Sequence, residues 1–392
     1  MDLTLTDEQE LIFNSALSFA RSAMTPEQIR AQEATEMGFD LQVWRQMVDA
    51  GWAGAPFAEK HGGSGLGLFE LSLIVTALGQ GAVPSPLFST VIEAGMLIDD
   101  FGSTAQRDAW LPRIAGGDVK LTTAICEAGN LYGTGDTATL ISMSSPGLRV
   151  SGTKMFVRDA SVAQSMICLG RSENSADELS FVLVSGDAPG IARRRLQAAG
   201  GESLWQVSFN DVIVGQDAIL GQPGKAGPPL RRLLMRGAAM KAAELIGIGQ
   251  AALDLTVGYA KERVQFGKPI GGLQAVHHHC TEMYRDLQVS RLLAWQAAAR
   301  LGSGVPAERE VAMAKAKASE AIPALTRTAH QIHGAVAYYR DYPLELYYHR
   351  AIAAQSAYGD AGHHRRMLAG LMREDVDRFR GDHAHDLPVH YL

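Results

Sequence analysis

The stretch YAKERVQFGKPIGGLQ, from Tyr259 to Gln274, places polar residues where an ordinary amphipathic helix does not need them. The preceding run, Pro229 to Ala260, carries Ala, Leu, Ile and Met on most helical faces, so we expect one long and largely buried helix. That helix leads into a guanidinium suited to phosphate (Arg263), an amide (Gln265) and an apolar ring (Phe266). Together these side chains suit a nucleotide, and a helical hairpin with a solvated basic end is the alternative.

The hydrophobic period divides the chain into three regions. Residues 1–118 have apolar residues at three- and four-residue spacing, and residues 223–380 return to long helical patterns that suit a bundle, including a helix from Leu273 to Arg300. Between them, residues 119–222 show short strand-like runs punctuated by Gly and Pro. The polar end, residues 381–392, is expected to be loosely ordered.

These patterns predict an α+β fold with an N-terminal helical domain, a middle antiparallel β-barrel and a C-terminal four-helix bundle. The helices expected in the first domain are Glu8–Ser22, Leu41–Ala50, Leu68–Gly79 and Ser89–Asp99. The strands expected in the second are Leu121–Ile125, Met155–Val157, Met166–Leu169, Leu179–Val184 and Trp205–Phe209.

Composition favours a soluble chain of two or three domains. The net charge is −6, from 36 basic and 42 acidic residues that are mixed along the 392 residues, so no basic stripe indicates nucleic-acid binding. No run approaches the roughly 20 apolar residues of a membrane span, and the start lacks the basic region of a signal peptide. We therefore expect a cytoplasmic protein. Its cysteines, Cys126, Cys168 and Cys280, form no close pair, which fits reduced thiols.

Two further motifs do not support a site. Gly247 to Ala252 fits a dinucleotide-binding string, but it lies inside a long helical run, where its small residues would let two helices approach closely. His277 to His279 are consecutive, so on a helix their imidazoles point about 100° apart and cannot share one ion. His330 and His333 could share a face, but no carboxylate or thiolate partner is evident. We expect no metal site.

The opening stretch resembles the acyl-CoA dehydrogenase family, in which Y-x-x-x-R-x-Q-F-G-x-P-I-x-x-x-Q is a well-defined motif. A second family motif follows at the right distance, QIHGAVAY from Gln331 to Tyr338, followed by DYPL from Asp341. Near the start, LTDEQ from Leu5 and GWAG from Gly51 look like the family's N-terminal domain. The resemblance covers nearly the whole chain.

The resemblance implies FAD as cofactor and an acyl-CoA thioester as substrate. A carboxylate removes the α-proton while the β-hydride passes to the flavin, and an electron-transfer flavoprotein or similar acceptor takes the electrons. In such tetramers the ADP half of a neighbouring subunit's FAD would be contacted by Arg263, Gln265, Phe266, Gln274, Gln331, His333 and Gly334. The chain's own flavin ring would be covered by two segments that include Ile125, Cys126, Phe156, Val157 and Arg158.

The sequence departs from the family at the catalytic base. Counting from His333 puts Tyr358 where a carboxylate is usual, and the position used on the long helix by other members is Gly237. Asp360 is a weak candidate base nearby. The residue after Gly237, an Arg near CoA and substrate in many members, is Ala238, although Arg236 is close and is a candidate substrate contact.

Contacts for a neighbour's ADP are therefore intact, while those serving the chain's own ring and substrate are eroded. A homotetramer needs both sets in each chain, whereas a heteromer does not. We favour a subunit of an α2β2 heteromer with a related partner, as in bacterial members that act on bulky, steroid-type acyl-CoAs. The alternatives are a self-sufficient homotetramer with a displaced carboxylate, and a non-redox scaffold of the same fold.

Overall fold

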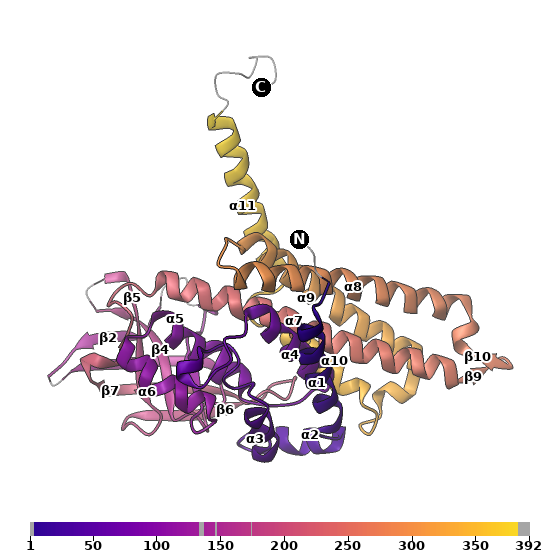
Figure 1. The fold of residues 1–392 in the computed structure, drawn as a ribbon, viewed down its shortest axis with the longest axis horizontal. Coiled ribbons are helices and arrows are strands. Elements are labelled where there is room, and N and C mark those ends of the chain that lie inside the picture. The colour runs from indigo at the N-terminus through magenta and orange to yellow at the C-terminus, as the bar shows by residue number, and fades with distance from the viewer. Residues whose placement is uncertain (1–3, 133–136, 146, 174, 383–392) are drawn as a thin grey trace.

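The computed structural model describes residues 4–132, 137–145, 147–173 and 175–382. Its first part is helical (Figure 1). The elements are α1 (Asp7–Ser22), α2 (Pro26–Glu33), α3 (Leu41–Asp49), η1 (Glu59–His61), α4 (Leu68–Gln80), the π-helical segment η2 (Phe88–Gly95), α5 (Met96–Phe101) and α6 (Thr104–Ala115).

Two helices of this part, α2 and α6, were not among those predicted. Each begins with a capping box, in which a hydroxyl and a glutamine three residues later exchange hydrogen bonds with each other's backbone. The pairs are Thr25 with Gln28 and Ser103 with Gln106. Both helices are short and only weakly amphipathic, so their hydrophobic pattern does not reveal them. The capping-box residues were the signal in the sequence that could have predicted them.

The middle part is a sheet with eight strands in the described residues. They are β1 (Leu121–Ala124), β2 (Leu140–Met143), β3 (Leu148–Arg158), β4 (Ser165–Ser172), β5 (Ser175–Ser185), β6 (Ile191–Leu196), β7 (Leu204–Val214) and β8 (Ile219–Leu220), with η3 (Gln216–Ala218) before the last. The order is β6-β7-β3-β2-β4-β5-β8, with β1 also pairing β4. The pairs β1–β4 and β2–β4 are parallel, so the sheet is mixed where we expected only antiparallel pairing.

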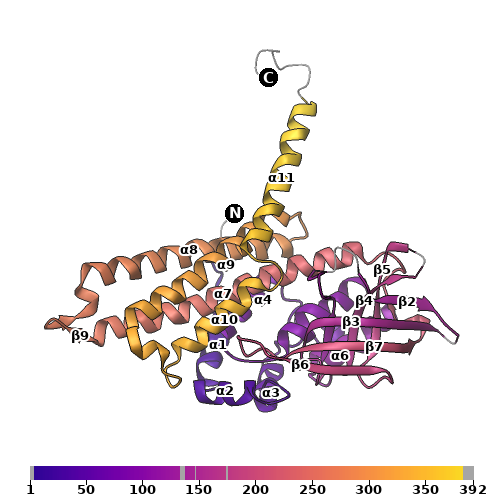
Figure 2. The ribbon, with the colours of Figure 1, turned by 180° about the vertical axis from the view of Figure 1, so that it is seen from behind.

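The last part is a bundle of long helices (Figure 2). They are α7 (Gly227–Glu262), α8 (Gln274–Gly302), α9 (Glu308–His333), α10 (Leu344–Ser356) and α11 (Ala361–Asp382). Between α7 and α8 lie the short strands β9 (Val264–Gln265) and β10 (Lys268–Pro269) and the turn η4 (Ile270–Gly272), and η5 (Gly334–Tyr338) follows α9. The predicted order of helices, strands and helices is confirmed.

The long helix α7 packs closely on α4, which joins the first and last parts of the chain. A Cβ added at Gly247 would overlap the backbone of α4 at Thr76 and Gly79, so only glycine allows this approach. The dinucleotide-like string at Gly247 to Ala252 is therefore a helix contact, as its small residues predicted. One hydrophobic core lies between α7, α8, α9 and α4, and a separate one fills the sheet domain.

The helix α11 projects away from the bundle (Figures 1 and 2). It extends to Asp382, so the first two residues of the segment expected to be loosely ordered are helical, and residues 383–392 lie outside the described part. Among the described residues, no helix is both long and apolar enough to cross a membrane.

Candidate functional site

The residues expected to contact ADP begin on a hairpin at the tip of the bundle. Strands β9 and β10 pair antiparallel, with Lys268 opposite Gln265. The two turn residues, Phe266 and Gly267, have φ of 53° and 75°, as a tight two-residue hairpin requires. Phe266 is 88% exposed, and within the described residues the Arg263 guanidinium has no hydrogen-bond or ion-pair partner. The hairpin thus presents a ring and a free cation to its surroundings.

This hairpin lies far from the sheet domain of its own chain. Figures 1 and 2 place β9 and β10 at the end of the bundle opposite to the strands β2 to β7. Gln274, the first residue of α8, is also exposed near this end. The hairpin and the sheet of one chain therefore cannot meet at a single ligand.

The second motif contacts the first through stacked rings. His333 is buried, its ring stacks on Tyr259 with centroids 4.5 Å apart, and its Nδ1 lies 2.8 Å from the Ala329 carbonyl oxygen. Burial lowers the pKa of His333. Gln331 and Gly334, in contrast, are exposed. The structure therefore leaves Gln331 and Gly334 available to a ligand, and puts the His333 ring in the interior, where it joins the ends of α7 and α9.

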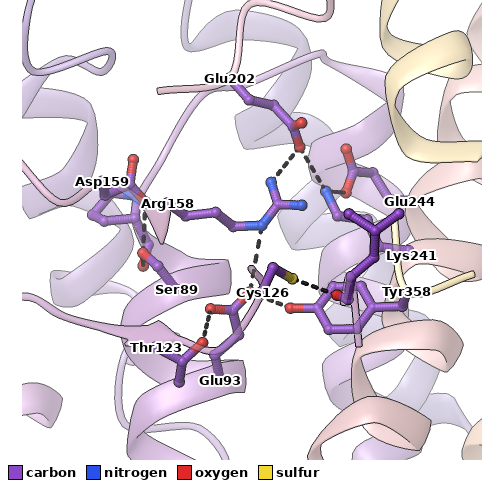
Figure 3. A network of polar contacts seen from close by, with 12 residues as sticks. Ser89, Glu93, Thr123, Cys126, Arg158, Asp159, Glu202, Lys241, Glu244 and Tyr358 are labelled. Atoms are coloured by element: carbon purple, nitrogen blue, oxygen red, sulfur yellow. Dashed lines mark hydrogen bonds and ion pairs between the residues drawn. The ribbon is translucent and has the colours of Figure 1, made fainter. Parts of the chain in front are cut away.

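The two segments expected to cover the chain's own flavin ring lie at β1 and at the end of β3. Ile125 and Val157 are buried, and Phe156 is 46% exposed with a φ of 56°. Cys126 lies with its Sγ beside the Leu131 carbonyl oxygen, and burial raises the pKa of this thiol to about 11. Arg158, the last residue of β3, extends into the protein (Figure 3).

The two positions expected to carry a catalytic base, Tyr358 and Gly237, face each other. A Cβ at position 237 would overlap the Tyr358 ring, so the absence of a side chain there makes room for the phenol. The Tyr358 hydroxyl donates to Glu93 of η2. Burial and the charge of Glu93 raise the pKa of Tyr358 well above its usual value. A neutral phenol therefore occupies the place of the carboxylate.

Glu93 begins a chain of buried charges that crosses all three parts of the molecule (Figure 3). Its carboxylate accepts from Thr123 at 2.8 Å and lies 3.4 Å from Arg158 Nε. Arg158 Nη1 donates to Glu202 at 2.5 Å, and Glu202 also accepts from Lys241 at 3.0 Å. Burial alone would lower the pKa of Arg158, but the charges of Glu202, Tyr358 and Glu93 raise it well above its usual value.

The far end of this network is Lys241, a lysine inside the apolar face of α7. Its Nζ donates to Glu244 at 2.7 Å and lies 4.5 Å from the centre of the Phe88 ring. The Arg158 guanidinium lies 5.4 Å from the centre of the same ring. Burial would raise the pKa of Glu202, but Arg158 and Lys241 lower it well below its usual range. The charged groups of the network are therefore paired with one another.

A cavity of about 110 Å³ adjoins the network. Its charged lining residues are Arg158, Asp159, Glu202, Lys241, Glu244 and Arg350. Asp159 accepts from Ser89 at 2.6 Å, and burial raises the pKa of this carboxyl to about 7. The volume is below the roughly 300–1,000 Å³ of small-molecule pockets, and the lining combines these charged groups with apolar side chains such as Val75, Leu78 and Ile92.

Two weaker candidates point elsewhere. Asp360 is exposed and caps α11 by accepting from the His363 backbone N–H at 2.7 Å, a hydrogen bond that lowers its pKa. Arg236 is buried and its guanidinium donates to Asp100 of α5, so it does not line the cavity. The proposed roles of base for Asp360 and substrate contact for Arg236 therefore lack support in the geometry.

The histidines gather no metal-binding set. Across the described residues, no group of three or more His, Cys, Asp or Glu side chains is placed to hold an ion. His277, His278 and His279 are exposed or half-exposed on α8, and His330 is held by the Thr326 carbonyl oxygen at 2.9 Å.

Sequence reasoning missed Glu93, Glu202 and Lys241. A signal was present for two of them, because Glu93 and Lys241 are charged residues inside apolar helical runs. Such charges are buried only when paired, so each implied a partner elsewhere in the fold.

Comparison with known proteins agrees with this architecture. Family models described as the acyl-CoA dehydrogenase N-terminal and C-terminal domains match residues 6–118 and 230–372. The chain is 29% identical to the acryloyl-CoA reductase (NADH) of Anaerotignum propionicum, with 94% of this chain and 95% of that one covered.

Solved structures give the same result. Butyryl-CoA dehydrogenase from Megasphaera elsdenii superposes with a TM-score of 0.88 at 25% identity, covering 95% of this chain and all of that one. The ChsE4–ChsE5 complex from Mycobacterium tuberculosis gives 0.86 at 26% identity, covering 95% and 99%. A variant of the Tcur3481–Tcur3483 steroid ACAD gives 0.84 at 28% identity, covering 95% and 100%. With the two family models and the order of helices, sheet and helices, these likenesses show that the chain belongs to the acyl-CoA dehydrogenase family, FAD-dependent oxidoreductases that act on CH–CH bonds.

Proposed function

We propose that this chain is a subunit of an FAD-dependent acyl-CoA dehydrogenase that supplies ADP contacts to a related partner chain in an α2β2 heterotetramer. The observation that carries the proposal is the contrast between the hairpin and the interior. Among the described residues, Arg263 and Phe266 are exposed and free at the tip of the bundle, while the two base positions hold Gly237 and Tyr358.

The residues of the hairpin fit the ADP half of FAD. An unpaired guanidinium gives a forked donor for a pyrophosphate, and an exposed aromatic ring gives a face for a base. Arg263, Gln265, Phe266 and Gln331 would hold that half, with Gln274 and Gly334 nearby. When bound, FAD supplies the acceptor for the β-hydride of the acyl group. Since the hairpin is remote from its own sheet domain, these contacts serve a neighbouring chain.

The segments of this chain that were expected to cover its own flavin ring do not fit that ring. The residue that ends the second ring-covering segment, Arg158, is a largely buried cation, 15% exposed, that pairs with Glu93 and Glu202. A neutral ring inserted there would separate ion pairs, and breaking a buried pair costs about 3–5 kcal/mol. No catalytic step is therefore assigned to this chain's own ring site, and the base and ring cover belong to the partner in our proposal.

The likenesses to solved structures support a heteromeric partner and a bulky acyl group. One of them is described as a complex of two different chains, ChsE4 and ChsE5, and another as a steroid ACAD. We accordingly propose a steroid-type acyl-CoA as substrate of the complex, with an electron-transfer flavoprotein or similar protein as acceptor. Three unpaired cysteines are consistent with a reducing, cytoplasmic setting.

The alternative is a self-sufficient homotetramer. One observation favours it: Glu93 is a carboxylate in contact with Tyr358, which stands at the expected base position, so Glu93 is a candidate for the displaced base. A non-redox scaffold would have no use for an exposed, unpaired Arg263 beside Phe266.

The test is expression of this chain alone and together with a related acyl-CoA dehydrogenase subunit that carries a carboxylate at the base position. Flavin absorbance and acyl-CoA oxidation with an artificial acceptor are measured on both samples. We expect little flavin and no oxidation from the lone chain, and both from the pair. A lone chain that oxidises an acyl-CoA would contradict the proposal.

A further inference from the structure

We propose that Glu93, gripped between Arg158 and Tyr358, closes this chain's own interior to both a flavin ring and an acyl thioester. The inference rests on the proposed function and goes further, because it assigns the closure to named groups. Tyr358 stands at the base position, and Arg158 ends the segment expected to cover the ring. Both bind one carboxylate.

The spacing leaves no room for the reacting groups. Tyr358 Oη donates to Glu93 Oε1, and Arg158 Nε lies 3.4 Å from that same oxygen. In a working site the space between base and ring cover holds a thioester and a flavin ring, two layers at contact distances of about 3.5–4.0 Å each. Here a single carboxylate oxygen fills that space (Figure 3).

The closure extends into the region beyond. Phe88 of η2 lies under both the Arg158 guanidinium and Lys241 Nζ, and its ring also meets the Tyr358 ring with centroids 5.8 Å apart. Glu202 links the two cations. The remaining cavity is about 110 Å³ and has Arg158, Glu202 and Lys241 in its partly apolar lining, so an acyl chain that reaches these ions would desolvate them without replacing their partners.

The loop that carries Tyr358 is held in place. Tyr358 has a φ of 57°, a strained value for a tyrosine, and His364 Nε2 lies 2.9 Å from its carbonyl oxygen. Buried Lys315 donates to the Gln355 and Gly359 carbonyl oxygens at 2.9 and 2.8 Å. These bonds on both sides of Tyr358 keep the phenol on Glu93.

The competing assignment is Glu93 as the displaced catalytic base. A base must present a free lone pair to the substrate proton. Glu93 instead accepts hydrogen bonds from Tyr358 and Thr123 and pairs with Arg158, so both of its oxygens are engaged. These contacts favour a filling role over proton abstraction.

The test uses Glu93→Gln in the co-expressed complex, which keeps the shape of the side chain and removes its charge. The matched control is Glu33→Gln, which breaks another largely buried ion pair, with Arg350 at 2.6 Å, and leaves the Glu93 contacts intact. We expect both complexes to retain the flavin content and turnover of the unaltered complex within about twofold, since neither site does chemistry. A thousandfold loss of turnover in Glu93→Gln with flavin retained makes Glu93 the base, and a loss of half of the flavin makes this interior a ring site. Either result overturns the inference.

If the Glu93→Gln chain does not assemble with its partner, the inference is tested by acyl-CoA binding to the unaltered complex. Acyl-CoA titrated into it should bind once per pair of chains, and two binding events per pair would overturn the inference. Failure of the proposed function is distinguishable, because it requires flavin and activity in the lone chain.

Discussion

The aromatic ring of Tyr358 packs directly against Gly237, across 121 residues of sequence, and these are the two positions where the resemblance to the family led us to expect a catalytic carboxylate. The two departures from the family pattern are therefore in direct contact with each other. Glycine at 237 makes the space, the tyrosine fills it, and the phenol is anchored on Glu93. A carboxylate at position 237 would require the tyrosine ring to move.

Enlarging Gly237 should destabilise the chain. Gly237→Ala forces a methyl into the Tyr358 ring, and such overpacking costs about 1–3 kcal/mol of unfolding free energy. The control is Gly258→Ala on the same helix, where a Cβ meets no atom within 4 Å and alanine should stabilise by up to about 1 kcal/mol. Urea unfolding of both variants measures the difference. Equal effects of the two substitutions would show that Tyr358 does not occupy this space.

Removing the cation of the hairpin should release flavin from the complex. Arg263→Ala leaves a charge-assisted contact to pyrophosphate unmade, which costs on the order of 1.5–3 kcal/mol, or roughly tenfold or more in FAD affinity. Gln331→Ala should weaken FAD in the same direction. Lys268→Ala, on the opposite strand of the hairpin, is the control and should have a smaller effect. Flavin retained equally in all three variants would contradict the assignment of the ADP contacts.

Asp360 should be dispensable for catalysis. Asparagine is as good a helix cap as aspartate, so Asp360→Asn should keep the α11 cap, the stability and most of the activity of the complex. Asp360→Ala should lose about 0.5–2 kcal/mol of stability through the cap alone. Initial rates and thermal unfolding distinguish the two effects. A thousandfold loss of rate in Asp360→Asn with flavin retained would make Asp360 the base.

The contribution of Asp159 to stability should fall as pH rises from about 4 to 7, against a rise from His364, whose pKa burial lowers to about 4. The pKa of Asp159 is raised to about 7 by burial, whereas an unfolded aspartate titrates near 3.9. Between these values the folded chain holds a proton that the unfolded chain has lost, so this contribution to the unfolding free energy declines with pH, by on the order of 2–4 kcal/mol.

Asp159→Asn should remove that component. The control Asp187→Asn alters an exposed carboxylate whose pKa is lowered by the Ser185 hydroxyl, and it should leave the decline in place. Denaturant unfolding at several pH values gives the difference curve between each variant and the unaltered chain. A difference curve for Asp159→Asn without slope between pH 4 and 7 would contradict the assigned titration.

Local patterns predicted the long helices well, whereas the paired strands β9 and β10 between two of them were not predicted. The apolar run before Arg263 is helix α7, and the Phe266–Gly267 turn follows its end, because these signals depend on neighbours within a few residues. The positions that lack a base came from the resemblance to the family, by counting from His333 and Arg263, and they stay a prediction.

The closure could not be predicted in this way. Glu93 meets Tyr358 across 265 residues, and Arg158 meets Glu202 across 44, so no periodic pattern links them. The parallel pairing of β1 and β2 with β4 likewise depends on strand order rather than on strand sequence. The stacking of the buried His333 ring on Tyr259 joins residues 74 positions apart and was not predicted either, while the expected contact of His333 with FAD stays a prediction.

The most direct test of the whole account is the ratio of FAD to polypeptide in the purified complex of this chain with its partner, measured by flavin absorbance after denaturation against quantitative amino-acid analysis. The account predicts one FAD for each pair of chains, because each site combines the partner's interior with the Arg263 hairpin of this chain. A ratio of one FAD for every chain, in the complex or in this chain purified alone, would contradict it.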